Sequence, residues 1–282
     1  MSYPISSEQF ENPLLKELLV ELNRSFEALA MQYYIIGATA RDIVFSALYG
    51  QGSARKTFDL DIAIAIPDWE TFEHISAELC SHGSFKKSKE QKQRFTYKDV
   101  YELDIVPFGE VAKADEKIYW PPEEDHAMSV KGFTEIAHDT IRLNVDGEFD
   151  INVASLPGIF ILKLVAWKDR SYKTSKDADD MSYIIASYLP IHQENLQEKY
   201  YHIYDDEEYT EYTAGAAILA IELRALLLGN DSIRNEVIAI LEAELAEREQ
   251  SGLILAAMQS ERTLKFEQVE KAFATLLQEI KK

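Results

Sequence analysis

The sequence predicts an α+β protein: a small mixed sheet with flanking helices, followed by an all-helical half. Before residue 155, short apolar segments with strand periodicity alternate with helical ones. After it, apolar residues recur at the three- and four-residue spacing of helices. The chain has 282 residues, 46% of them hydrophobic, which is enough for two ordinary domains with buried cores. We therefore expect domains at 1–154 and 155–282.

Composition and charge exclude several classes of protein. The single cysteine, Cys80, cannot form a disulfide framework within the chain. The first residues lack the basic start and apolar core of a signal peptide, and no apolar run reaches the roughly eighteen residues of a membrane span. The net charge of −20 argues against broad, non-specific nucleic-acid binding, although it allows a local basic patch. A cytoplasmic protein without a membrane partner is expected.

Periodicity and turn residues predict the elements of the first half. A helix over 13–31 has Asn12 as its N-cap and Pro13 in its first turn. Asp146 and Gly147 mark a turn between two of the expected strands. Strands are expected over 33–36, 58–66, 93–98, 101–108, 134–137, 140–145 and 149–154, and further helices over 39–49 and 67–80.

The second half reads as helices separated by polar breaks. Ser155 can cap the first of them, in which apolar residues recur at helical spacing. Gly229 and Asn230 form a clear break. Further helices are expected over 176–188, 193–202, 212–228, 231–249 and 263–280.

The first signs of chemistry lie in the stretch 33–61. A buried strand runs into Gly37 and a helix, and a second strand carries Asp59 and Asp61. Because strand side chains alternate between faces, these two carboxylates point to one side, roughly 6.5–7 Å apart. Two carboxylates at that spacing can share divalent cations, and a glycine turn that opens a helix offers N–H groups to phosphate. The stretch suggests chemistry on a nucleoside triphosphate.

A third acid, Asp104, lies in an apolar strand and shares a face with Glu102. An unpaired buried carboxylate is costly, so an ion-paired core residue is one interpretation. Beside Asp59 and Asp61, a third metal ligand or a general base is the favoured interpretation.

Positive charge concentrates over residues 85–98. This basic stretch could guide an anionic acceptor such as tRNA, or it could protect an exposed loop and edge strand; both interpretations stay open. The scattered histidines and single cysteine do not form a zinc site, and the sequence has no P-loop motif. The basic residues of the stretch are Lys86, Lys87, Lys89, Lys92, Arg94 and Lys98.

Together these motifs resemble the nucleotidyltransferase fold of the DNA polymerase β type. More specifically, the chain resembles the AbiEii/AbiGii abortive-infection nucleotidyltransferase toxins of toxin–antitoxin and phage-defence systems. Each motif alone is weak, and their order is what is specific. One departure is Ala38, where such families usually have glycine or serine. The matching segments are Gly37-Ala-Thr-Ala-Arg-Asp42, Thr57-Phe-Asp-Leu-Asp-Ile62, Leu103-Asp-Ile-Val-Pro-Phe-Gly109, Trp120-Pro-Pro, Leu156-Pro-Gly, Lys163-Leu-Val-Ala-Trp-Lys-Asp-Arg170, and Lys176-Asp177 with Asp180.

The resemblance implies in-line displacement at the α-phosphate of a nucleoside triphosphate (NTP), with release of pyrophosphate. Asp59 and Asp61 would then hold two Mg²⁺ (or Mn²⁺) ions, and Asp104 would ligate one of them and help to deprotonate the acceptor hydroxyl. The turn at Gly37 would face the β- and γ-phosphates, and Lys163 would reach the triphosphate. The other nucleotide-binding candidates are Ala38, Thr39, Arg41 and Asp177.

Several of these candidates have a structural alternative. Arg41 can pair with Asp42, and Asp177 can pair with Arg170 instead of orienting a lysine. Lys163 can extend to solvent along the apolar helix. Thr57 can simply hydrogen-bond near Asp59.

Three functions follow from the resemblance. The first is an active nucleotidyltransferase toxin that modifies a tRNA or protein hydroxyl and has a cognate antitoxin. The second is a catalytically degenerate nucleotide- or partner-binding protein on the same scaffold, which Ala38 favours. The third is a housekeeping tRNA-end or antibiotic-modifying enzyme, which shares the chemistry and differs in the acceptor.

Overall fold

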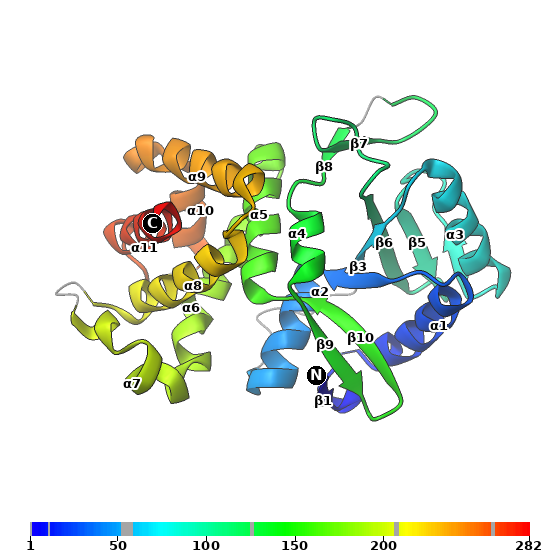
Figure 1. The fold of residues 1–282 in the computed structure, drawn as a ribbon, viewed down its shortest axis with the longest axis horizontal. Helices are drawn as coiled ribbons and strands as arrows, with labels where there is room; N and C mark the ends of the chain where they lie inside the picture. Colours follow the sequence, from blue (N-terminus) through cyan, green and yellow to red (C-terminus); the bar gives the residue numbers. More distant parts are fainter. Residues whose placement is uncertain (1, 11, 52–58, 125–126, 206–208, 261–262) are drawn as a thin grey trace. The chain divides into compact units, whose positions relative to one another are not determined.

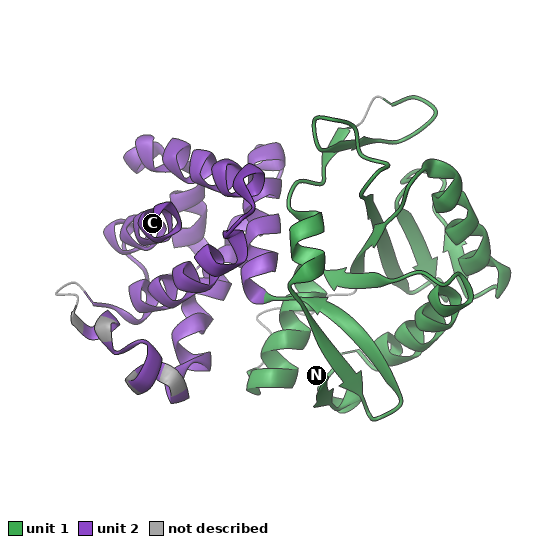
Figure 2. Cartoon of the chain, viewed as in Figure 1, with its two compact units in different colours: residues 1–155 green, residues 156–282 purple. Residues whose placement is uncertain are grey.

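The computed structural model describes residues 2–10, 12–51, 59–124, 127–205, 209–260 and 263–282 (Figure 1). The chain forms two compact units, Met1–Ser155 (unit 1) and Leu156–Lys282 (unit 2) (Figure 2). Unit 1 contains a mixed sheet with helices, and the described residues of unit 2 form helices and turns. The predicted α+β fold is confirmed.

An eight-stranded sheet organises unit 1. The neighbouring inner strands β3 and β6 are parallel, whereas β2 runs antiparallel to β3 and β5 antiparallel to β6. Leu60, Ile62, Ala63 and Ile64 are fully buried, as expected for a strand covered on both faces. The strand order is β1 (Tyr3–Ile5), β9 (Thr140–Val145), β10 (Phe149–Ala154), β2 (Tyr33–Ile36), β3 (Asp59–Ala65), β6 (Tyr101–Phe108), β5 (Arg94–Tyr97) and β4 (Phe85–Lys87).

The helices of unit 1 mostly follow the sequence pattern. Asn12 accepts a hydrogen bond from the Leu14 N–H at 3.0 Å, so it caps α1 as expected. The helix expected over 39–49 begins two residues earlier and continues as a π-helical segment, η2. The helical segments are η1 (Ser7–Gln9), α1 (Leu14–Ala28), α2 (Gly37–Ile43), η2 (Val44–Leu48), α3 (Trp69–Ser81) and α4 (Phe133–His138).

One strand prediction in unit 1 is wrong. Residues 134–137 were expected to be extended, but they lie in α4. Phe133 and Ile136 are both buried, and their three-residue spacing fits the helical period. A separate two-stranded sheet, β7 (Lys117–Tyr119) with β8 (Ala127–Ser129), was not predicted, and neither were β1 and β4.

The turn predicted at Asp146 and Gly147 is confirmed, and it shares positive φ values with the turn between β5 and β6. Asp146 and Gly147 have φ of 52° and 74° between β9 and β10, and Lys98 and Asp99 have φ of 50° and 58° between β5 and β6. Short polar residues and glycine tolerate this conformation best. These turns fix the registers that place Arg94 opposite Asp104 and Phe149 opposite Val145.

Unit 2 is a helical assembly in which α8 packs against α6 and α11. A Cβ atom added at Gly215 of α8 would lie 2.1 Å from the Ile185 carbonyl oxygen of α6, so these two backbones touch. The first helix begins directly after the expected cap, Ser155. The segments are α5 (Leu156–Arg170), α6 (Lys176–Ile191), η3 (Gln193–Asn195), α7 (Leu196–Lys199), η4 (Tyr201–Asp205), α8 (Glu211–Leu227), α9 (Asp231–Ala246), η5 (Arg248–Gln250), α10 (Gly252–Ser260) and α11 (Phe266–Lys281).

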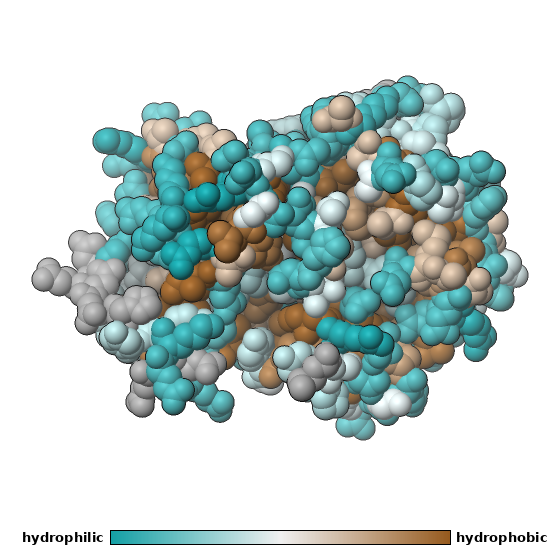
Figure 3. Space-filling view, viewed as in Figure 1, coloured by the Kyte–Doolittle hydropathy of each residue, from teal (hydrophilic) through white to brown (hydrophobic). Residues whose placement is uncertain are grey.

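The helix expected over 193–202 is replaced by the short segments η3, α7 and η4, and α10 was not predicted separately. Hydrophilic residues cover much of the face drawn in Figure 3, as the net charge of −20 leads one to expect. None of the helices in the described ranges combines the length and the apolar character that a bilayer crossing needs.

Candidate active site

Two of the candidate residues of unit 1, Asp61 and Asp104, lie in a row of paired residues across four neighbouring strands. Ile36 of β2 pairs with Asp61 of β3, Asp61 pairs with Asp104 of β6, and Asp104 pairs with Arg94 of β5. Residues in register on neighbouring strands point to the same face, and the strands are about 4.7–4.9 Å apart. The fold therefore places Asp104 beside Asp61.

Asp59 lies at the start of β3, two residues before Asp61, and its register partner on β6 is Glu102. Asp59 is exposed, and Asp61 is partly buried. This end of the sheet thus gathers four carboxylates on two adjacent strands. Their mutual repulsion is expected to require a cation nearby.

Gly37 follows β2, begins α2 and packs directly against this acidic end. Its φ is +71°, and an added Cβ atom would lie 2.3 Å from Oδ2 of Asp61. A side chain at this position would therefore have to displace the carboxylate. Glycine is required here both for the left-handed backbone and for the close approach.

Gly37→Ala is expected to reduce the free energy of unfolding by about 1–3 kcal/mol, since both the backbone conformation and the contact with Asp61 oppose a side chain. Urea denaturation measures this loss. Gly50→Ala is the matched control, because Gly50 has a φ of +65° with nothing within 4 Å of an added Cβ atom. Equal losses in the two variants would show that the contact with Asp61 is unimportant.

Thr39 ties the start of α2 to the start of β3. Its hydroxyl donates to the Asp59 carbonyl at 2.6 Å, and its side chain also hydrogen-bonds Tyr101. Burial, together with the negative charges of Asp59, Asp42 and Asp61, raises the pKa of Tyr101 to about 12, against the opposing effect of the Thr39 bond. Thr39 thus positions Asp59, while Ala38 beside it is buried. Thr57 lies outside the described residues.

Arg41 pairs with Asp42, which is the structural alternative that the sequence left open. It is only 2% exposed, and its Nε donates to Oδ1 of Asp42 at 2.8 Å. Nη2 of Arg41 also lies 2.6 Å from that oxygen. Both residues belong to α2, so the pair lets the buried guanidinium keep a counter-charge within its own helix.

Arg94 is the functional candidate that sequence reasoning missed. Its Nε and Nη2 each donate to one oxygen of Asp104 at 2.8 Å, and its Nη1 lies 2.6 Å from Glu102. The bonds to Asp104 raise the pKa of Arg94 above its ordinary value, with smaller contributions from the charges of Asp104, Glu102 and Asp61 and an opposing effect of burial. Alternation was the available signal: Phe95 and Tyr97 are buried, so Arg94 faces the acids.

Most of the basic stretch is engaged with carboxylates, which favours the protective interpretation. Its first strand, β4, lies at the edge of the sheet, where lysines discourage pairing with another chain. The ion pairs, besides those of Arg94, are Lys86–Asp99, Lys87–Glu73, Lys92–Glu123 and Lys98–Glu17.

The carboxylates of this end have the donor chemistry of a Mg²⁺ or Mn²⁺ site, because both ions prefer oxygen ligands. Among the described residues, however, no three His, Cys, Asp or Glu side chains are already gathered to hold a metal ion. Arg94 already engages both oxygens of Asp104. The donor set fits a hard divalent cation once Asp104 is released.

In unit 2, Lys163 belongs to a buried ion-pair cluster. Its Nζ lies 2.6 Å from Oδ2 of Asp180 and 3.4 Å from Oδ1 of Asp177, and its side chain is 13% exposed. Asp177 is fully buried and accepts two hydrogen bonds of 2.7 Å from Arg170. Both partners expected for Asp177 are therefore present, and Lys163 does not extend to solvent.

The charge state of Asp177 reflects a balance of opposing effects. Burial raises the pKa of its carboxyl, while the hydrogen bonds from Arg170 and the charges of Lys163 and Arg170 lower it. The pKa lies below its ordinary value. Asp177 is thus ionised at neutral pH and holds two cations in place.

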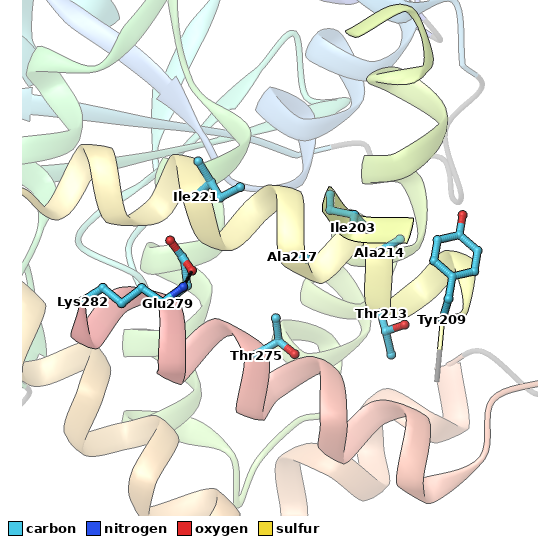
Figure 4. A pocket seen from close by; sticks show the side chains of 9 residues that line it. All are labelled: Ile203, Tyr209, Thr213, Ala214, Ala217, Ile221, Thr275, Glu279 and Lys282. Carbon is cyan, nitrogen blue, oxygen red and sulfur yellow. Dashed lines mark hydrogen bonds and ion pairs between the residues drawn. The ribbon is translucent and has the colours of Figure 1, made fainter. Parts of the chain in front are cut away.

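Unit 2 also contains a pocket of about 200 Å³. Figure 4 shows Thr213, Ala214, Ala217 and Ile221 of α8 on one side of it and Thr275 and Glu279 of α11 on another. Sites that hold small ligands usually measure about 300–1,000 Å³. This pocket is small for a nucleotide and contains none of the candidate residues.

Comparison with known proteins gives three findings. A family model described as "Nucleotidyl transferase AbiEii toxin, Type IV TA system" matches residues 18–279. No curated protein matches the chain. Among solved structures, ANT(2")-Ia in complex with adenylyl-2"-tobramycin matches at 12% identity and a TM-score of 0.38, over 66% of this chain and 91% of that one.

The likeness to ANT(2")-Ia assigns no substrate, because both its identity and its TM-score are low. The family model, by contrast, matches most of the chain. Its match extends through both units and includes every candidate residue. It confirms the resemblance that the ordered motifs indicated. The chain belongs to the AbiEii nucleotidyltransferase toxin family and is a nucleotidyltransferase.

Proposed function

We propose that the protein is a metal-dependent toxin that transfers a nucleoside monophosphate from an NTP to a hydroxyl of RNA, tRNA in particular, or of protein. The observation that carries this proposal is the row across the sheet. Asp61 and Asp104 are in register on parallel strands, and Gly37 packs against Asp61. A cognate antitoxin is the proposed partner, in keeping with the family.

In the proposed reaction, the acceptor hydroxyl oxygen bonds to the α-phosphorus and the bond from that phosphorus to the bridging oxygen breaks. Pyrophosphate leaves with the bond's electron pair, and the hydroxyl proton passes to a base. Asp59, Asp61 and Asp104 would hold two Mg²⁺ or Mn²⁺ ions, and Asp104 would also help to remove the proton. When bound, the metals neutralise charge on the phosphoryl oxygens and ease loss of that proton.

The phosphate end of the site is proposed on the resemblance. Backbone N–H groups after Gly37, at Ala38 and Thr39, would face the β- and γ-phosphates. On the same resemblance, Lys163 is proposed as a nucleotide-binding residue, and Asp177 and Asp180 fix its position in unit 2. Arg41 would act indirectly, since it is buried and paired with Asp42.

The acceptor class can be tested with cell extract. Each of the four α-labelled nucleotides is incubated with extract, Mg²⁺ and the protein, and the labelled product is then treated with ribonuclease or with protease. We expect label from one nucleotide in one macromolecular fraction, and no label when EDTA is present during the incubation. Absence of label with every nucleotide, from folded protein, would contradict the proposal.

A degenerate, binding-only site is the second candidate. The observation that favours it is the full engagement of Asp104 by Arg94, in addition to the side chain at Ala38. Calorimetry separates the two, because an active site should bind nucleotide more tightly in the presence of Mg²⁺. A degenerate site should bind it equally with and without the metal.

A further inference from the structure

We infer that Arg94 is a positioning residue that competes with the divalent cation for Asp104, so that metal binding requires the guanidinium to exchange partners. This inference rests on the proposed metal site. It assigns to Arg94 control over when the third carboxylate becomes available. The family match and the sequence motifs give Arg94 no role.

The geometry of the pair carries the first step. Arg94 and Asp104 form a parallel two-bond contact in which each oxygen accepts one N–H at 2.8 Å. Such bidentate pairs are stronger and more directional than single ion pairs. The side chains are 23% and 16% exposed, so water screens this contact less than one at the surface. The contact occupies one lone pair of each oxygen and places a positive charge beside them, so it weakens the attraction of Asp104 for a metal ion.

Charge carries the second step. Asp59, Asp61, Glu102 and Asp104 lie on two adjacent strands. Arg94 is in register with Asp104, and the charges of Asp104, Glu102 and Asp61 act on its guanidinium. The guanidinium therefore supplies the neutralising charge that a divalent cation would bring. Two cations drawn to one carboxylate cluster are expected to compete, because each weakens the field that attracts the other.

Glu102 makes the exchange feasible. Its Oε2 lies 2.6 Å from Nη1 of Arg94, and its side chain is 47% exposed. When Asp104 binds a metal ion, the guanidinium of Arg94 can remain paired with Glu102, where it is partly hydrated. Release of Asp104 then leaves no buried charge unpaired, which would otherwise oppose metal binding.

The test is Mn²⁺ affinity, measured by calorimetry or by the electron paramagnetic resonance of free Mn²⁺ without nucleotide. Arg94→Gln is expected to bind Mn²⁺ about tenfold or more tightly than the wild type, because the metal no longer has to displace a charge-assisted pair. Arg94→Lys should lie between them, since a lysine cannot occupy both oxygens at once. Thermal melts establish that each variant is folded. If Arg94→Gln does not fold, the Mn²⁺ affinity of Arg94→Lys tests the inference.

Arg142→Gln is the matched control. Arg142 makes two hydrogen bonds, at 2.9 and 2.6 Å, to Oδ2 of Asp150 on the β9–β10 hairpin of the same sheet. This variant also removes an arginine from an aspartate in unit 1, and it should leave Mn²⁺ affinity unchanged. An equal gain in this variant would mean that net charge, and not release of Asp104, explains the effect.

The outcomes separate this inference from the proposed function. Weaker or unchanged Mn²⁺ binding in Arg94→Gln, with binding by the wild type that Asp61→Asn abolishes, overturns the competition alone. Arg94 would then support Asp104 as a ligand or have no part in metal binding. Absence of Mn²⁺ binding in every variant, or binding that Asp61→Asn does not alter, overturns the metal site and this inference with it.

Discussion

Asp61→Asn is expected to lower the rate of nucleotidyl transfer by about 10³-fold while leaving the fold intact. A bound metal supplies several kcal/mol of transition-state stabilisation, and each 1.36 kcal/mol corresponds to about a factor of ten in rate. Asparagine keeps the shape of Asp61, so its contact with Gly37 should persist, but it removes the charge that would hold the metal. The measurement is initial rate of label transfer at saturating NTP.

Asp59→Asn should also lower the rate of nucleotidyl transfer, because Asp59 shares a strand face with Asp61. The matched control is Asp150→Asn, a strand aspartate of the same sheet that accepts hydrogen bonds from Arg142 and Asn144. This variant should retain transfer activity at a temperature where it is folded. Similar losses in Asp61→Asn and Asp150→Asn would mean that the acidic end of β3 has no special part in the reaction.

Asp177→Asn is expected to lower the free energy of unfolding by about 2–4 kcal/mol, because it leaves Arg170 without its buried counter-charge and Lys163 with Asp180 alone. The loss should fall below that of a wholly buried pair, since the Arg170 side chain is 48% exposed and partly hydrated. Urea denaturation measures it. Asp169→Asn is the control, because Asp169 is exposed at the end of α5 and should change stability by about 0.5 kcal/mol or less.

The same ion pairs predict a pH dependence. The folded-state pKa of Asp177 is lowered, so its stabilising effect is present above the unfolded-state value of about 4. The effect is lost as pH falls through the folded-state pKa. The wild type should therefore lose more stability than Asp177→Asn on acidification below about pH 4. Parallel pH profiles for the two proteins would contradict the assigned role of Asp177.

Period-two alternation was enough to predict which strands carry Asp59, Asp61 and Asp104 and which of these acids share a strand face. It could not predict the parallel register that sets Asp61 beside Asp104, because register depends on contacts between segments far apart in the chain. The expectation of a strand over 134–137 failed because a four-residue segment is too short to distinguish the strand period from the helix period. Burial of Phe133 and Ile136 decided in favour of the helix.

The ion pair of Arg94 could not be predicted from the sequence either, because its partner lies on another strand. In the sequence Arg94 stands among lysines, and it was interpreted with them as part of one basic stretch. The hairpin between β5 and β6 turns it toward Asp104, whereas lysines of the same stretch pair with acids such as Glu73 and Glu17. Charge counted along the chain cannot separate these roles, because the partners come from other elements.

The central claim, nucleotidyl transfer by the acidic end of β3, is tested most directly by comparing two labels. The protein, Mg²⁺ and cell extract are incubated in parallel with NTP labelled at the α-phosphate and with NTP labelled at the γ-phosphate. The account predicts that α-label becomes attached to a macromolecule, that γ-label is released as pyrophosphate, and that Asp61→Asn abolishes both. Transfer of the γ-label to the macromolecule, or α-label transfer that Asp61→Asn leaves unchanged, would contradict it.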